Sequence, residues 1–131
     1  MLDSIMHVLF LHQNFPAQFR YIVPRLVSEF GWRCTFMTSR EEGSLPGIEK
    51  ILYRCTSGAT KANHICTRNF ENTVHEAYAV FETLKPRRDL KPDLIVAHTG
   101  FGSSVFLPFL YDAPLITALA IAATRALTLP P

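Results

Sequence analysis

The stretch HVLFLHQNFPAQFRYIVPRL, residues 7–26, decides the fold. It begins inside MHVLFLH (6–12), a short continuous apolar run of the kind expected for a strand buried on both faces. The polar HQNFP overlaps its end, and an amphipathic pattern follows. Apolar residues spaced three and four apart predict one face of a helix: Phe19, Ile22, Val23, Leu26, Val27 and Phe30. A strand that leads directly into a helix is a joint at which α/β proteins often bind a ligand.

Two prolines and a glycine set the limits of this helix. Pro16 suits the first helical turn, where its missing N–H is not needed. Pro24 lies inside the apolar pattern, where proline interrupts the hydrogen bonds, so we expect the helix to kink or restart there. Gly31 fits the left-handed residue that ends many helices.

The rest of the chain alternates between strand and helix patterns. Apolar runs predict strands at 32–39, 48–55, 93–98 and 114–120, with a loop at 40–47 and a short helical segment at 105–111. A second helix presents an apolar face of Phe70, Val74, Ala77, Tyr78, Phe81 and Leu84. Strands separated by helices require crossover connections. We therefore expect one α/β domain over residues 1–131, a parallel sheet of about four to five strands with helices on both faces.

Composition excludes several classes of protein. Hydrophobic residues make up 48% of the 131 residues and charged residues 18%, which is typical of a globular chain. Thirteen basic and eleven acidic side chains give a net charge of +2. This charge is too small for a dense basic face, so we expect no nucleic-acid partner. A small basic surface that contacts phosphates or lipid head groups stays open.

The cysteines and the apolar runs bear on location. Cys34, Cys55 and Cys66 are odd in number and cannot form a closed disulfide framework, which indicates a reducing compartment. No leader pattern opens the chain, and the longest apolar stretch is shorter than the roughly 20 residues that span a bilayer. We expect a cytoplasmic protein and leave open a peripheral contact with the inner membrane.

Histidines and small polar residues follow two of the predicted strands. His12 begins the loop after the first strand, and His98 ends the strand at 93–98. Carboxyl ends of parallel strands share one edge of a sheet, so the loops at 12–15 and 98–103 should meet in one groove. A single histidine at a strand end more often caps the sheet, whereas two at equivalent ends favour a binding site. Two roles stay open for Phe15: a ring face for a ligand, or core packing beneath the following helix.

Other site motifs are incomplete. Gly100-Phe101-Gly102 lacks the third glycine of a dinucleotide fingerprint, and HQNF contains no glycine. The chain holds neither a phosphate loop nor the Gly-x-Ser-x-Gly of a serine nucleophile. His64 and Cys66 lack a second pair of zinc ligands. We expect no metal and no bound cofactor.

Four segments together resemble the N-terminal half of bacterial family 4 glycosyltransferases: VLFLHQNFPAQFRYIVPRL (8–26), TFMTSR (35–40), PDLIVAHTGFGSSVFL (92–107) and DAPLI (112–116). That family contains retaining enzymes of the GT-B architecture, in which two Rossmann-like domains face a cleft and a sugar is transferred from a nucleotide-sugar. The resemblance runs from about residue 6 to residue 116. It implies a Rossmann-like domain on the acceptor side of such an enzyme.

The resemblance also implies roles at matching positions. His98 would face the transferred sugar as the candidate catalytic residue, through polar contacts rather than nucleophilic attack. Gly100 and Gly102, in the loop after His98, would let the backbone approach the ligand closely. The implied chemistry stabilises a leaving diphosphate with polar donors and needs no metal held by paired aspartates. The implied substrate-binding residues are His12, Gln13, Asn14, Phe15, Gly100, Gly102 and Ser103, the last standing where relatives often carry an acidic residue.

The chain departs from the family after residue 116. TALAIAATRALTLPP (117–131) is unlike the aromatic and acidic continuation of relatives, and we expect the donor-binding domain of such enzymes to be missing. Glu41 and Glu49 match the spacing of that domain's glutamate pair, but Gly43 and Pro46 lie between them, so we interpret the match as chance. We expect this fragment to be inactive alone, whether a natural truncation, a frameshift or a chosen boundary produced it.

Two functions therefore stay open. The first is the acceptor-side domain of a sugar transferase, whose full-length form would bind a nucleotide-sugar and an acceptor sugar or lipid-linked acceptor. The second is a stand-alone flavodoxin-like domain that uses the same strand ends to bind a small anion or a protein. Exposed apolar surface, including ALAIAATRALTL (118–129), predicts a homo-oligomer.

Overall fold

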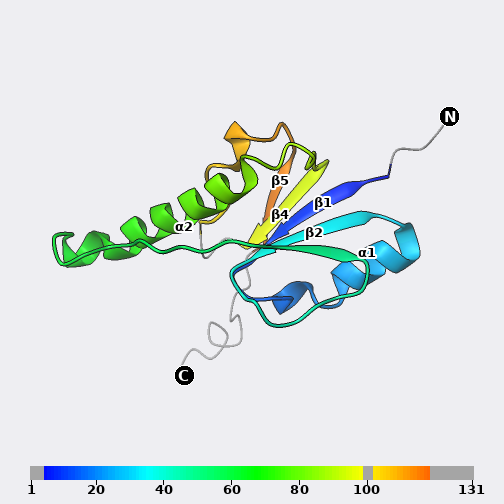
Figure 1. Ribbon diagram of the computed structural model, residues 1–131, viewed down its shortest axis with the longest axis horizontal. Coiled ribbons are helices and arrows are strands. Elements are labelled where there is room, and N and C mark those ends of the chain that lie inside the picture. Colours follow the sequence, from blue (N-terminus) through cyan, green and yellow to red (C-terminus); the bar gives the residue numbers. More distant parts are fainter. Residues whose placement is uncertain (1–4, 99–101, 119–131) are drawn as a thin grey trace, which may run out of the picture.

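The computed structural model describes residues 5–98 and 102–118 and shows a five-stranded parallel sheet with a helix on each face (Figure 1). The strand order is β3-β2-β1-β4-β5, and every neighbouring pair is parallel. The predicted α/β class and all five predicted strands are confirmed. The elements are β1 (His7–Leu11), α1 (Ile22–Phe30), β2 (Arg33–Thr38), β3 (Ile48–Leu52), α2 (Arg68–Leu84), β4 (Leu94–His98) and β5 (Leu115–Ala118).

The central strand β1 divides the core into two layers. Its residues from Val8 to Leu11 are each at most 2% exposed, as the apolar run predicts. Side chains alternate across a strand, so Leu9 and Leu11 join the layer that contains Val80 and Leu84 of α2. Val8 and Phe10 face the other way, into a layer with Phe19, Val23 and Phe36. Each layer thus has its own helix, and β1 is buried from both sides.

The start of α1 differs from the expected single helix. Pro16 does not begin it; a short 3-10 turn at Ala17–Phe19 comes first, and α1 starts at Ile22. Pro24 is therefore the third residue of α1, where its missing N–H costs no helical hydrogen bond, so the helix begins two residues before Pro24 instead of kinking or restarting there. At the other end Gly31 is left-handed (φ 65°), and Trp32 N–H donates to Leu26 O at 3.1 Å.

The second helix extends past the sheet. Figure 1 shows the first part of α2 projecting beyond the strands, with the coil that follows β3 running beside it. Only its second half is buried in the core, through Ala77, Val80 and Leu84. Phe70 and Tyr78, expected on the apolar face, are 72% and 56% exposed. No helix in the described residues has the length and apolar character needed to cross a membrane.

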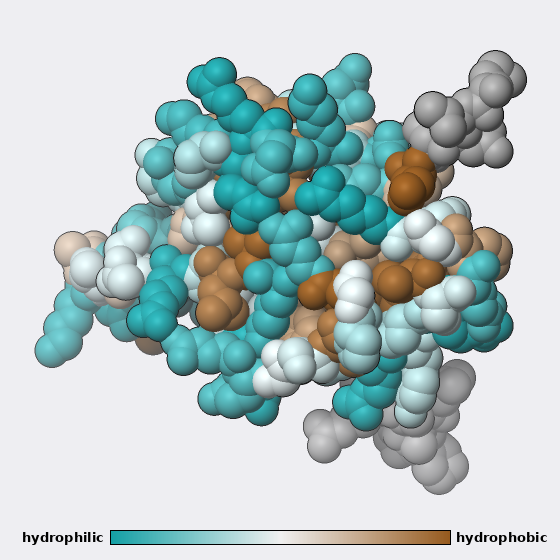
Figure 2. Space-filling model, turned by 45° about the vertical axis from the view of Figure 1, so that its right-hand side comes forward, coloured by the Kyte–Doolittle hydropathy of each residue, from teal (hydrophilic) through white to brown (hydrophobic). Residues whose placement is uncertain are grey.

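One face of the sheet is only partly covered. Leu94 and Val96 of β4 are half-buried because α1 does not extend over β4 and β5. An apolar groove of about 360 Å³ runs there between α1 and Ile116 of β5. On the face seen in Figure 2, apolar side chains gather in patches surrounded by hydrophilic ones. The segment expected to mediate association, 118–129, lies outside the described residues except for its first position.

Candidate functional site

We call the carboxyl ends of β1 and β4, where the order of the strands reverses, the crevice. From β1 the chain passes through α1 to β2 and β3 on one side, and α2 then carries it back to β4 on the other side. In open parallel sheets, the point at which the strand order reverses is where ligands bind, beyond the carboxyl ends of the strands. His12 directly follows β1, and His98 is the last residue of β4.

The two histidines meet at this crevice. Their ring centroids lie 4.8 Å apart with the planes at 63°, in an edge-on arrangement. The register explains the contact, because Leu11 of β1 pairs with Ala97 of β4 and the next residue of each strand is a histidine. His12 is 7% exposed and His98 is half-buried, so both line the end of the sheet rather than extending into solvent.

The surroundings of His12 fix its protonation. Burial lowers the pKa of His12 below its usual 6.5, and the neighbouring His98 lowers it further. His12 is therefore neutral at pH 7. The backbone N–H of Asn14 donates to His12 Nδ1 at 2.9 Å, so in the neutral ring the proton is on Nε2. This tautomer makes Nε2 a hydrogen-bond donor at the carboxyl edge of the sheet.

The loop after β1 is held by β2. Thr38 Oγ1 donates to the carbonyl oxygen of Gln13 at 2.7 Å, and Ser39 Oγ donates to the same oxygen at 3.1 Å. These bonds anchor the backbone next to His12. Asn14, by contrast, is exposed and lies two residues beyond His12 in the same loop. An anchored backbone with an exposed amide is suited to binding polar groups.

Phe15 does not present its ring to the crevice. It is 7% exposed and packs edge-on against Phe36 with the ring centroids 4.8 Å apart. Lys50 Nζ lies 4.5 Å from the ring centroid, and the loop at Gly43 contacts the ring edge. Of the two roles left open for Phe15, the structure shows core packing, so the expectation that its face contacts a sugar ring is wrong. The reason is the neighbouring β2, whose Phe36 belongs to the same core cluster as Phe15.

Two residues near the crevice were not predicted from the sequence. Glu76 of α2 accepts a hydrogen bond from Gln13 Nε2 at 3.2 Å and another from the Tyr53 hydroxyl at 2.7 Å. Burial and this bond to the carboxylate raise the pKa of Tyr53, which therefore stays protonated. The carboxylate of Glu76 thus joins α2, the loop after β1 and the end of β3. Tyr53 directly follows β3 and so lies at the same sheet edge. This position at a strand end is the sequence feature that could have identified Tyr53.

Gly102, in the loop after β4, lies close to α2. Gly102 has a left-handed backbone (φ 61°), and a Cβ at this position would lie 2.2 Å from Thr73 Cγ2. The close approach that requires glycine here is therefore to α2. Ser103 is only 3% exposed, which places it beneath the loop surface. Gly100 lies outside the described residues.

The crevice presents side chains that can form hydrogen bonds. No group of three or more histidine, cysteine, aspartate or glutamate side chains in the described residues is arranged to hold a metal ion. Among the described residues, the rings of His12 and His98 meet there, and the exposed Asn14 lies two residues beyond His12. Such groups can bind hydroxyls or phosphate oxygens and can stabilise developing negative charge.

Comparison with known proteins gives the chain a family. A search of the curated proteins found no match. The glycosyl transferase family 4 group matches residues 30–118, from the last residue of α1 to the last residue of β5. This match includes β2, β3, α2 and β4, and with them His98 and Gly102. The chain belongs to the glycosyl transferase family 4 group.

Proposed function

We propose that this domain forms the acceptor-side wall of a glycosyltransferase that uses a nucleotide-sugar. The observation that carries the proposal is the pair of histidine rings 4.8 Å apart at the reversal of strand order. Family membership supports a sugar-transfer function in general. The crevice supports a ligand that is rich in hydroxyl and phosphate oxygens, because its groups are hydrogen-bonding ones.

In this proposal each group has a stated task. His98, at the end of β4, contacts the transferred sugar through its ring nitrogens. Neutral His12 donates from Nε2 to a sugar hydroxyl or phosphate oxygen, and its lowered pKa keeps it in this form at pH 7. Asn14 supplies an amide at the rim. None of these groups acts as a nucleophile, so their contribution is to orient the sugar and to stabilise charge on the leaving diphosphate.

Gln13 takes a supporting role. Its side chain is bonded to Glu76 and its carbonyl oxygen to two hydroxyls, so it holds the loop that carries His12. We assign Gln13 and Glu76 as positioning residues. Gly102 likewise has a positioning role, because a larger residue there would collide with Thr73 of α2.

The proposed partners follow from this chemistry. They are a nucleotide-sugar and an acceptor that is a sugar or a lipid-linked sugar. We also expect the chain to self-associate through the apolar surface near the groove between α1 and β5, where Ile22 and Ile116 are 51% and 54% exposed. Sedimentation velocity at rising protein concentration checks this, and a monomer at all concentrations would contradict it.

A binding titration with matched histidine variants tests the proposed function. The chain is titrated with UDP- and GDP-sugars and with free sugars by calorimetry. We expect saturable binding that His98→Ala and His12→Ala each weaken by about fivefold or more, since each removes a hydrogen bond to the ligand. His64→Ala is the control, because His64 is exposed and its ring accepts a hydrogen bond from Cys66 N–H within its own turn. Absence of binding to every sugar and nucleotide-sugar would favour the flavodoxin-like alternative.

A further inference from the structure

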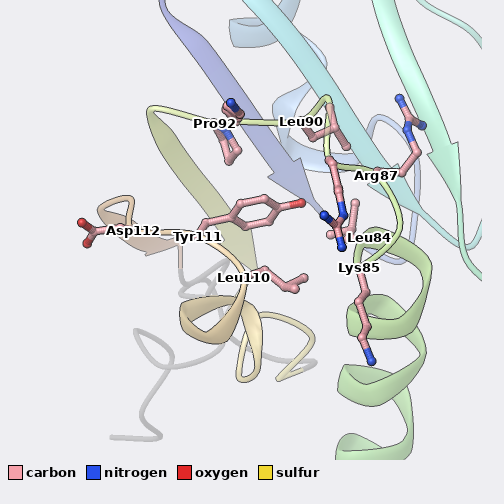
Figure 3. A pocket seen from close by; sticks show the side chains of 10 residues that line it. Leu84, Lys85, Arg87, Leu90, Pro92, Leu110, Tyr111 and Asp112 are labelled. Carbon is pink, nitrogen blue, oxygen red and sulfur yellow. The ribbon is translucent and has the colours of Figure 1, made fainter.

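A second hollow lies at the edge of the sheet opposite the histidines. It has a volume of about 360 Å³ and is formed by the end of α2, the loop before β4 and the segment before β5 (Figure 3). These residues precede β4 and β5, so they lie at the amino-terminal edge of the strands. The hollow therefore shares no residue with the crevice at His12 and His98. Its size is within the range of small-molecule sites.

The interior of this hollow is apolar and its rim is basic. Leu84 and Leu90 are buried beneath it, and Leu110 and the ring of Tyr111 form a half-buried wall. Figure 3 shows the ring of Tyr111 reaching across toward the loop that follows α2. The exposed rim carries four charged side chains: Lys85, Arg88, Lys91 and Asp112.

The exposed cations on the rim form no ion pair within the described residues, although Glu82 lies beside Lys85 and Arg88. Within residues 5–98 and 102–118, the ion pairs of this region involve Arg87, which bonds Glu49 at 2.5 Å and Asp89 at 2.9 Å. Lys85, Arg88 and Lys91 have no acidic partner among the same residues. Of the exposed charged residues that line the hollow, three are cationic and one, Asp112, is anionic. Cations without an ion-pair partner suit an anionic ligand.

A polar group in the wall also lacks a partner. Among the described residues, the hydroxyl of Tyr111 is the one buried side-chain polar atom with no hydrogen bond. A buried hydroxyl without a partner costs about 1–3 kcal/mol. Since the Tyr111 ring lines the hollow, a small turn of this side chain would let the hydroxyl donate to an oxygen of a bound ligand.

We propose that this hollow binds an organic phosphate monoester. The phosphate is a dianion near neutral pH and sits at the rim against Arg88 and Lys91, and the organic group rests on Leu110 and the Tyr111 ring. The site is distinct from the sugar-transfer crevice and does not depend on the function proposed there. An ordinary explanation of the cations is that they complement the carboxyl end of the α2 dipole. That explanation accounts for neither the apolar wall nor the unpartnered hydroxyl.

Calorimetric titration with phenyl phosphate tests the proposal. We expect saturable binding that is tighter than that of inorganic phosphate, because the phenyl ring removes apolar wall from water. Arg88→Ala and Lys91→Ala should each weaken binding about threefold to tenfold, and Tyr111→Phe about twofold to fivefold. Arg88 and Lys91 are exposed, so both variants should fold, which urea unfolding verifies. Lys61→Ala, an exposed cation of the loop before α2, and His98→Ala should leave this affinity unchanged.

A vesicle-binding experiment shows whether the phosphate belongs to a lipid head group or to a soluble ester. Co-sedimentation with phosphatidic acid vesicles, absent with phosphatidylcholine and reversed by phenyl phosphate, would assign the site to a lipid head group. Binding of phenyl phosphate without co-sedimentation would assign it to a free ester, and both results support the proposal. It is overturned if phenyl phosphate does not bind saturably, or if Arg88→Ala and Lys91→Ala bind as well as Lys61→Ala. Either result would leave the sugar-binding titration unaffected.

Discussion

Gly102→Ala should destabilise the protein more than a left-handed glycine alone would explain. Two costs add at this position. A non-glycine residue in the left-handed region costs about 1–2 kcal/mol. The new methyl group would also lie 2.2 Å from Thr73 Cγ2, and an overlap of this kind in a packed region costs about 1–3 kcal/mol. We therefore expect the free energy of unfolding to fall by about 2–5 kcal/mol.

Gly31→Ala is the matched control for the backbone cost. Gly31 has nearly the same φ, 65° against 61°, and nothing lies within 4 Å of the position that a Cβ would take. Its replacement should cost only the left-handed penalty of about 1–2 kcal/mol. The difference between the two variants then measures the contact between the loop after β4 and α2.

Urea unfolding of a double-mutant cycle separates the two costs. Thr73→Ala removes the Cγ2 atom that blocks the methyl group, so Gly102→Ala in that background should cost no more than Gly31→Ala. The expected coupling is about 1–3 kcal/mol. Equal losses for Gly102→Ala with and without Thr73 would refute the packing of this loop on α2.

Three further predictions concern pH, the core and the cysteines. Burial lowers the pKa of His7 and of His12 below 6.5, and a neighbouring group adds to this, Arg33 for His7 and His98 for His12. The contribution of both histidines to stability is therefore fully present above pH 6.5 and is lost as the pH falls through the lowered pKa values. Urea unfolding between pH 8 and pH 5 should show this decline in stability, and His7→Gln or His12→Asn should make it smaller. A decline as large in both variants as in the unmodified protein would contradict the role of these histidines. Phe15→Ala should lower the free energy of unfolding by about 3–5 kcal/mol, and a loss below about 1 kcal/mol would show that the ring is not in the core. Burial raises the pKa of Cys34 to about 11, so at pH 8 a thiol reagent should modify exposed Cys66 quickly and Cys34 only after unfolding; equal rates would be the contrary result.

The strands could be predicted from the sequence because burial on both faces leaves a local signal. The run at 7–11 is apolar at nearly every position, and β1 is buried from both sides. Gly31 was equally predictable, since a glycine after an apolar helical stripe is a local feature. The start of α1 was not, because the spacing of Phe19 with Ile22 fits a 3-10 turn and an α-helix alike.

The site could be predicted only in part. His12 and His98 were found because each directly follows or ends a strand, and parallel pairing brings such positions together. Glu76 was missed since it is separated from Gln13 by 63 residues and no local pattern links them. The orientation of Phe15 depends on Phe36 of the neighbouring strand, which the residues around Phe15 do not encode.

The position of the site is tested most directly by nuclear magnetic resonance of the histidine rings. The chain is labelled with ¹⁵N at histidine and titrated with a UDP-sugar, a GDP-sugar and their free sugars. We predict that the free protein shows His12 protonated on Nε2, and that the ring signals of His12 and His98 shift together and saturably while those of His64 stay fixed. Saturable binding that shifts His64 or distant signals and leaves His12 and His98 unmoved would contradict a site between β1 and β4.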